Sequence, residues 1–282
     1  MIQRILTALV LIPLVLLLIL RAPKPVLAVV AGGVALLAIR EFLDLARHYG
    51  IEPFSWGTYV FVGLSFAFSA GQLAPLAQAF FLGLAPFIFL AVGMKRGNLR
   101  SIYPAAAASV FAFTYIAIPM GLLVRVDEFN LIYLMLVVWS GDIFAYFVGK
   151  SLGRHKMSPR ISPGNTWEGA AASLLASVGF GTMLYHYRPQ VVHWLFERHL
   201  LGSYAYDGNF YGPALWKVIL LSAALNVAAQ LGDLVESAIK RGADVKDSGS
   251  ILPGHGGMLD RIDALLFAAP ILWCGTVLLT LR

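Results

Sequence analysis

The sequence predicts an all-α, polytopic membrane protein with about nine transmembrane helices, the N-terminus outside and the C-terminus inside. Of its 282 residues, 59% are apolar and 13% are charged, whereas soluble domains average about 45–50% and about 25%. The apolar residues form runs near the span length of about 20 residues. Basic residues cluster between the runs and give a net charge of +6. These observations exclude an ordinary soluble enzyme, a disordered chain and a nucleic-acid binder.

Nine apolar runs justify the helix number. They cover residues 5–20, 25–46, 57–73, 74–93, 103–124, 130–149, 168–186, 214–234 and 262–281. Only Gln72 and Pro75 interrupt the third and fourth runs, so this pair is either a tight hairpin or one re-entrant element. We expect residues 1–129 to be an N-terminal transmembrane region of about five helices. Residues 130–282 would form a catalytic transmembrane region with cytoplasmic loops 149–169 and 235–262.

The distribution of Lys and Arg predicts the orientation, because cytoplasmic loops are enriched in these residues. With nine spans, the loops after the even-numbered spans and the C-terminus carry 14 of them, and the opposite side carries 7. The C-terminus and the two richest loops would then face the cytoplasm. The single cysteine, Cys274, excludes an internal disulfide or a thiolate metal site within the chain.

Polar residues are costly inside a span, so those that interrupt the spans are candidates for function. Asp142, in VVWSGDIFAYFVGK, is flanked by apolar residues on both sides. It is expected to face a wet cavity or to pair with a cation of another helix.

The loop at 149–169 combines four cations with glycines and two Ser-Pro steps. Cations and free backbone amides can cradle phosphates, which makes Lys150, Ser162 and Thr166 candidate substrate-binding residues. Thr166 is also placed to cap the next helix. The alternative is a plain positively charged cytoplasmic loop.

The segment at 230–242, QLGDLVESAIKRG, places Asp233, Glu236, Ser237 and Lys240 on one helical face. This stripe suits a metal-phosphate ligand or, alternatively, an amphipathic extension with internal ion pairs. The next segment, 244–266, brackets His255 with glycines and continues to Asp260 and Asp263. Two carboxylates one turn apart suit Mg²⁺, which takes one or two carboxylates together with substrate phosphates.

At residues 237–263 the sequence resembles the signature of the phosphatidate cytidylyltransferase, or CDP-diacylglycerol synthase, family. The matching positions are Ser237, Lys240, Arg241, Lys246, Asp247, Pro253, His255, Gly256, Gly257, Asp260, Arg261 and Asp263. Residues 142–163 and 230–237 are also similar to the family. Asn165 stands where the family usually has a lysine, and Ala170–Ala172 replace a frequent glycine pair.

The resemblance implies an enzyme of the bacterial inner membrane that joins CTP to phosphatidate, releases pyrophosphate, uses Mg²⁺ and forms a homodimer. It implies that Asp233 and Asp260 bind the metal. We expect Asp263 to be a further ligand or to support one, and Lys240, Arg241 and Lys246 to hold phosphates. Asp247 would orient Lys246 or bind a second cation. The backbone of Gly254, Gly256 and Gly257 would line the triphosphate, with His255 donating a hydrogen bond, and Ser237 would contact substrate.

Two alternatives remain open on the sequence. One is a related CTP-using membrane enzyme acting on another lipid phosphate or on a polyprenol. The other is a transporter of a phosphorylated solute, for which intramembrane Asp142 and the basic loops would be suitable. Against transport, the charged residues cluster on one side, whereas alternating access usually needs a midplane site between repeats.

Overall fold

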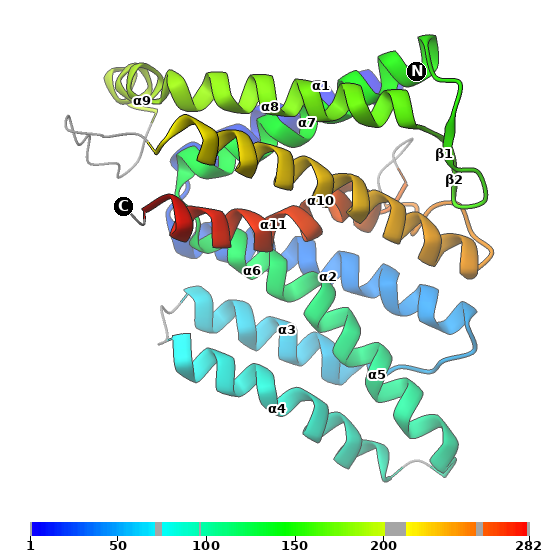
Figure 1. Cartoon of the computed structure of the whole chain (residues 1–282). Coiled ribbons are helices and arrows are strands. Elements are labelled where there is room, and N and C mark those ends of the chain that lie inside the picture. Colours follow the sequence, from blue (N-terminus) through cyan, green and yellow to red (C-terminus); the bar gives the residue numbers. More distant parts are fainter. Residues whose placement is uncertain (1, 71–74, 96, 201–212, 252–255, 281–282) are drawn as a thin grey trace. The chain divides into compact units, whose positions relative to one another are not determined.

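The computed structural model describes the chain except residues 1, 71–74, 96, 201–212, 252–255 and 281–282 (Figure 1). The all-α prediction is confirmed, because the described residues of all nine apolar runs lie on helix, apart from residue 214 just before α10. The elements are α1 (Ile2–Arg21), α2 (Lys24–His48), α3 (Ser55–Ala70), α4 (Pro75–Gly93), η1 (Leu99–Ser101), α5 (Ile102–Ala112), η2 (Phe113–Ala117), α6 (Ile118–Arg125), α7 (Glu128–Ser151), β1 (Lys156–Ser158), β2 (Ser162–Thr166), α8 (Trp167–His186), α9 (Arg188–Glu197), α10 (Leu215–Gly242) and α11 (Leu259–Thr280).

Two features were not predicted from the sequence. The loop at 149–169 contains an antiparallel hairpin of β1 and β2, in which Lys156 pairs with Thr166 and Ser158 with Ser162. The polar stretch after α8 contains α9, a short helix that begins directly after Tyr187. Both segments lack the long apolar run on which the prediction of the other helices rested.

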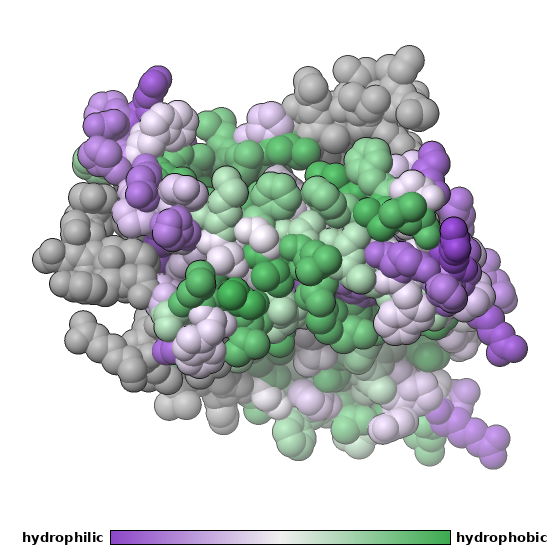
Figure 2. All heavy atoms as spheres, turned by 45° about the horizontal axis from the view of Figure 1, so that its top comes forward, coloured by the Kyte–Doolittle hydropathy of each residue, from purple (hydrophilic) through white to green (hydrophobic). Residues whose placement is uncertain are grey.

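Within the described part of the chain, four helical segments are long and apolar enough to cross a membrane: Lys24–His48, Leu99–Arg125, Glu128–Ser151 and Leu215–Gly242. The chain is therefore a multi-pass membrane protein by length and composition, and the nine-span count and the orientation stay predictions. Figure 2 shows hydrophobic side chains over the middle of the presented face and hydrophilic ones towards its edges. Within Leu99–Arg125, the π-helical turn η2 precedes Pro119, which has no N–H to donate to the preceding turn.

The chain divides into two compact units, which we describe separately. The first comprises Met1–Arg4, Pro23–Arg125 and Ile239–Ile262. Its centre is α2, which packs against α3, α5 and α6 and fully buries Ile39 and Leu43. Because hydrocarbon chains are as apolar as leucine, helices in lipid gain from close packing more than from burial. Gly32 illustrates this, since a Cβ there would lie 3.0 Å from the Phe66 ring.

The second unit comprises Ile5–Ala22, Val126–Ala238 and Asp263–Arg282. Here α7 and α8 pack side by side along much of their length (Figure 1). Asn226 of α10 donates to the hydroxyls of Ser173 and Ser177 at 2.7 and 2.8 Å, and Gln230 donates to Asn226 at 2.6 Å. A Cβ on Gly141 would lie 2.6–2.7 Å from these same polar atoms. Hydrogen bonds of this kind contribute about 0.6–2 kcal/mol each between membrane helices.

Candidate active site

Asp260 lies in the first turn of α11, in the first unit, where four donors hold its carboxylate. Its Oδ2 accepts hydrogen bonds from the backbone N–H of Gly257 at 2.7 Å, the backbone N–H of Ser248 at 3.0 Å and the Ser248 hydroxyl at 2.9 Å. Its Oδ1 contacts Lys240 Nζ at 2.5 Å, and both side chains are about nine-tenths buried. The two charges are therefore paired, and the start of α11 favours the carboxylate electrostatically.

The glycines around this carboxylate are there for geometric reasons. Gly256 has a φ of +79°, a conformation that disfavours residues with a side chain, and a Cβ there would lie 2.6 Å from Asp260 Oδ2. Gly257 is buried against the Ser248 hydroxyl and the Glu41 carboxylate. The glycine backbone thus approaches the protein's own Asp260 carboxylate, and its approach to a substrate triphosphate stays a prediction.

Glu41 of α2 was missed by the sequence analysis. It is 4% exposed and accepts hydrogen bonds from the backbone N–H of Met258 at 3.0 Å and of Leu259 at 2.8 Å. The Ser248 hydroxyl also lies within hydrogen-bonding distance, at 3.1 Å. The apolar run 25–46 carries three charged residues near its end, Arg40, Glu41 and Asp44. They were the available signal, because a charged residue inside a span is functional by default.

Asp233 of α10 lies in the second unit beside Asn165 and Asp142. The Asn165 side-chain amide donates to Asp233 Oδ2 at 3.0 Å, and Asp142 of α7 lies within electrostatic range of Asp233. Among the described residues, neither carboxylate forms an ion pair. Asp142 therefore has another carboxylate as its neighbour. The expected pairing of Asp142 with a cation of another helix is not found among the described residues.

Asp263 belongs to this second unit as well. Gly232 faces its backbone, since a Cβ on Gly232 would lie 2.5 Å from the Asp263 carbonyl oxygen. The Asp263 side chain accepts from the N–H of Ala264 at 2.8 Å. The glycine immediately before Asp233 therefore lets α10 approach α11 closely at Asp263.

The hairpin of β1 and β2 positions the start of α8. The Thr166 hydroxyl accepts from the Gly169 N–H at 3.2 Å, which confirms the predicted cap. His155 binds Glu168 through its ring Nδ1, at 2.6 Å, and through its backbone N–H. The backbone N–H of Glu168 itself, the His155 side chain, and the backbone N–H groups of His155 and Arg154 lower the pKa of the Glu168 carboxyl to about 2.

The remaining predicted residues lie at or near the surface. Lys150 is exposed and rests over the Tyr146 ring, 5.5 Å from its centroid, and Ser162 is half-buried in β2. Arg241, Lys246 and Asp247 are exposed, whereas Ser237 is half-buried. The predicted stripe on α10 is only partly a wet face, because Glu236 is fully buried. Gly254 and His255 lie outside the described residues.

The donor set is suitable for a hard cation, although only in part. In the portion of the chain that the structure describes, no three His, Cys, Asp or Glu side chains gather closely enough to hold a metal. Mg²⁺ does not require such a cage, since it binds one or two carboxylates plus waters and substrate phosphates. Asp233 and Asp142 are neighbouring carboxylates, and the donor beside them is the neutral side-chain amide of Asn165. A divalent cation would offset the negative charge of the two carboxylates.

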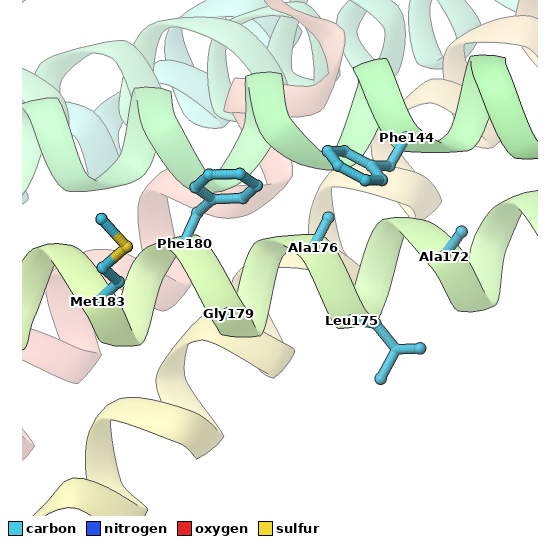
Figure 3. A pocket seen from close by; sticks show the side chains of 7 residues that line it. All are labelled: Phe144, Ala172, Leu175, Ala176, Gly179, Phe180 and Met183. Carbon is cyan, nitrogen blue, oxygen red and sulfur yellow. The ribbon is translucent and has the colours of Figure 1, made fainter.

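A shallow apolar groove of about 510 Å³ runs along α8 in the second unit. Its lining consists of Phe144, Ala172, Leu175, Ala176, Gly179, Phe180 and Met183. Figure 3 shows Phe144 of α7 and Phe180 of α8 on the same side of α8, while Leu175 points away. The centroids of the two phenylalanine rings are 6.0 Å apart. With no polar side chain in its wall, this groove suits a hydrocarbon chain and is unsuited to a nucleotide.

Comparison with known proteins decides the family. The sequence profile of the cytidylyltransferase family matches residues 2–279. This chain belongs to that family. It is 32% identical to the phosphatidate cytidylyltransferase of Haemophilus influenzae over 95% of this chain and 96% of that protein. It is also 34% identical to the phosphatidate cytidylyltransferase of Brucella abortus, over 78% of this chain and 72% of that protein.

A shorter match is more similar. The phosphatidate cytidylyltransferase of Bacillus subtilis is 43% identical over 152 residues, which is 53% of this chain and 49% of that protein. The resemblance stated from the signature at 237–263 is therefore confirmed, and it extends well beyond the C-terminal half, to the N-terminal helices that include α2.

Proposed function

We propose that this enzyme transfers the cytidylyl group of CTP to phosphatidate, giving CDP-diacylglycerol and pyrophosphate for phospholipid biosynthesis. The observation that carries the proposal is the cluster around Asp260. There, residues far apart within the family signature, Lys240 and Gly257, both bind one carboxylate. The relatives named above support the same substrates.

The chemistry sets what the residues must supply. A phosphate oxygen of phosphatidate attacks the α-phosphorus of CTP, the bond from that phosphorus to the bridging oxygen breaks, and pyrophosphate leaves. The nucleophile is already an anion at neutral pH, so the site needs no strong general base. The difficulty is that several negative charges must be brought together, and fixed positive charge and precise positioning lower this barrier.

We assign roles to the residues on these grounds. Asp233 and Asp260 would hold Mg²⁺, with Asp263 supporting them, and the ion would supply charge neutralisation at the transferring phosphates. Lys240 contacts Asp260 Oδ1 and is the cation nearest this carboxylate, so we infer that it orients Asp260 and binds phosphate. Arg241 and Lys246 are exposed and would bind substrate phosphates, Arg241 beside the Val245 carbonyl to which its guanidinium donates at 3.1 Å. Asp247 would orient Lys246 or bind a second cation.

The substrate-binding assignments for the other predicted residues remain part of the proposal. Ser237 and the glycine loop, with His255, would contact CTP. Lys150 and Ser162 of the hairpin segment would bind phosphate. Thr166 would act through the backbone, because its hydroxyl already caps α8.

We also propose a homodimer in the bacterial inner membrane, with the active site and the C-terminus on the cytoplasmic side. The 14 to 7 distribution of basic residues supports this orientation. A reporter fused at the C-terminus should be cytoplasmic, and one inserted at residue 200 should be periplasmic. Finding residue 200 in the cytoplasm would contradict the nine-span arrangement. Cross-linking in membranes at low protein density would test the dimer.

A turnover assay tests the function itself. Purified protein in detergent is given labelled CTP, phosphatidate and Mg²⁺, and the lipid product and pyrophosphate are measured together. Stoichiometric CDP-diacylglycerol and pyrophosphate are expected. Labelled product only with another lipid phosphate, or phosphoryl transfer from CTP to a polyprenol, would favour the related enzyme. Uptake of a phosphorylated solute into vesicles without turnover would favour a transporter.

A further inference from the structure

Glu41 is a charged side chain in the middle of an apolar helix face. The residues on either side of it along the buried face of α2, Ala38 and Leu45, are 0% and 3% exposed, and Glu41 itself is 4% exposed. Burying a carboxylate without compensation costs several kcal/mol. Among the described residues, no Lys, Arg or His forms an ion pair with Glu41, so its compensation has to come from hydrogen bonds.

Three donors in the segment before α11 provide those hydrogen bonds. Glu41 Oε1 accepts from Met258 N–H, and Oε2 accepts from Leu259 N–H. The Ser248 hydroxyl shares its one proton between Glu41 Oε2 and Asp260 Oδ2. Met258 immediately precedes α11 and Leu259 is its first residue, so their N–H groups have no partner within the helix. A side chain from α2, more than 200 residues earlier, therefore caps α11.

The same segment holds Asp260. Gly257 N–H binds Asp260, and the next two N–H groups, of Met258 and Leu259, bind Glu41. The Ser248 hydroxyl lies 2.9 Å from Asp260 Oδ2 and 3.1 Å from Glu41 Oε2. The two carboxylates thus share one frame of donors, and any displacement of Glu41 moves the groups that orient Asp260.

The packing of the loop around Glu41 is tight. A Cβ on Gly249 would lie 2.5 Å from Glu41 Oε1, and a Cβ on Gly257 would overlap Oε2. The loop backbone therefore passes directly over the carboxylate on both sides of the undescribed residues 252–255. This arrangement leaves no room for a larger group and fixes the distance from α2 to the loop.

We propose that Glu41 is a positioning residue for the cytidylyl transfer: it anchors Ser248 and the start of α11 so that Asp260 keeps Oδ2 in the loop and directs Oδ1 toward Lys240. The inference rests on the proposed function for its kinetic consequences only. Through Glu41, the N-terminal helices gain a role in the site. Neither the signature at 237–263 nor the charge pattern indicated such a role.

Glu41→Gln separates positioning from simple burial. The amide has nearly the same size but offers one acceptor oxygen, and its NH₂ group must face a backbone N–H or the serine hydroxyl. At least one donor at the start of α11 is then left without a partner. Glu41→Asp keeps the charge and shortens the reach, so it should retain part of the anchoring. Glu52→Gln is the matched control, because the Glu52 side chain is 75% exposed in the connection between α2 and α3.

The first measurement needs no substrate. Hydrogen–deuterium exchange of the full-length protein in detergent should show the amides of Ser248 and residues 257–259 exchanging at least about tenfold faster in Glu41→Gln. The amides of α7 and α8 should be unchanged. Wild-type exchange at 248 and 257–259 in Glu41→Gln would overturn the proposal. If Glu41→Gln does not give folded protein, Glu41→Asp carries the same test.

The second measurement is kinetic. We expect Glu41→Gln to lower kcat by about 10–100-fold and to raise the Mg²⁺ concentration for half-maximal rate, while KM for CTP changes little. Glu41→Asp should recover part of kcat, and Glu52→Gln should match the wild type. A merely structural role predicts a lower Tm with normal kcat and Mg²⁺ dependence per folded molecule, and that result would also overturn the proposal. Wild-type protein that makes no CDP-diacylglycerol would instead refute the proposed function, and the exchange measurement would still decide the anchoring.

Discussion

The carboxylates of Asp260 and Asp233 are fixed by different means in the two units. In the first unit, Asp260 accepts three hydrogen bonds on one oxygen and contacts Lys240 with the other. In the second unit, Asp233 accepts one hydrogen bond from the residues that the structure describes, that of Asn165, and it has Asp142 as its charged neighbour. Its position is set instead by its helix, which packs through Asn226 and the polar contacts next to it.

This difference in hydrogen bonding predicts that Asp260 contributes to both stability and catalysis, whereas Asp233 contributes mainly to catalysis. A carboxylate that satisfies buried donors and a buried lysine contributes to the stability of its surroundings, so removing its charge should affect folding as well as catalysis. A carboxylate with a single donor and a like-charged neighbour contributes little to folding. Its charge is better explained by a ligand than by the packing of the protein. Substituting the two aspartates should therefore affect stability differently, although both are proposed to bind the same metal.

The largest effect on catalysis without loss of stability is expected from Asp233→Asn. The substitution keeps the size and removes the charge, so kcat should fall at least about 10²–10³-fold. The Tm should stay within a few degrees of the wild type, because only the bond from Asn165 is altered. Mg²⁺-dependent turnover per folded molecule and a thermal melt in detergent measure both. Asp244→Asn is the control, since Asp244 is exposed in the turn after α10 and asparagine tolerates its φ of 57°. Near wild-type turnover would show that Asp233 is not a ligand.

Asp260→Asn should lower both quantities. It removes the charge that Lys240 Nζ contacts, and breaking a buried ion pair costs about 3–5 kcal/mol. We expect a clearly lower Tm together with a loss of kcat similar to that of Asp233→Asn. If both residues hold the same ion, the double variant should be little slower than either single variant, because residues that act as a unit are not additive. A lower Tm with normal turnover in the surviving protein would make Asp260 a structural residue and leave Asp263 or Asp142 as the better candidate ligand.

Gly141→Ala tests whether helix packing positions the second carboxylate. The new Cβ would lie 2.6–2.7 Å from polar atoms of Asn226, Ser173 and Ser177, so α7 and α10 must separate or the network must rearrange. We expect a destabilisation of about 1–3 kcal/mol, typical of inserting a methyl group into a packed core, and a lower kcat in the folded fraction. Gly121→Ala in α6 is the control, because nothing lies within 4 Å of a Cβ there. An unchanged Tm and kcat would mean that the helices are loosely packed at Gly141.

The sequence was sufficient for some of this arrangement and not for the rest. Continuous apolar runs predicted the helices, because span length and hydropathy are local properties. Thr166 was predicted as a cap because a cap is defined by its neighbours along the chain. Glu41 was missed because its partners, Ser248, Met258 and Leu259, are more than 200 residues away. The hydrogen bonds to the Asp260 carboxylate could not be predicted for the same reason. Residue spacing shows which residues share a helical face, whereas the donors to a carboxylate depend on the tertiary fold.

Asn165→Lys is expected to have the smallest effect, and it tests the sparsely bonded carboxylate directly. Asn165 Nδ2 lies 3.0 Å from Asp233 Oδ2, and it stands where the family usually has a lysine. A lysine here keeps a donor and adds a positive charge near Asp233 and Asp142. Turnover should therefore persist, and KM for one of the two anionic substrates should fall by up to about tenfold, the equivalent of one charge-assisted hydrogen bond at about 1.5 kcal/mol.

The matched control for this change is Asn165→Gln, which lengthens the side chain without adding charge. If KM falls for the lysine variant and not for the glutamine variant, charge at this position is used for binding. A rise in the Mg²⁺ requirement with no change in KM would mean that the lysine neutralises Asp233 and competes with the cation, which would still support Asp233 as a ligand. Complete loss of turnover in both variants would mean that position 165 is packed and that the hairpin segment does not bind phosphate through it. The outcome therefore distinguishes a carboxylate whose negative charge must remain available from one that tolerates a permanent counter-charge.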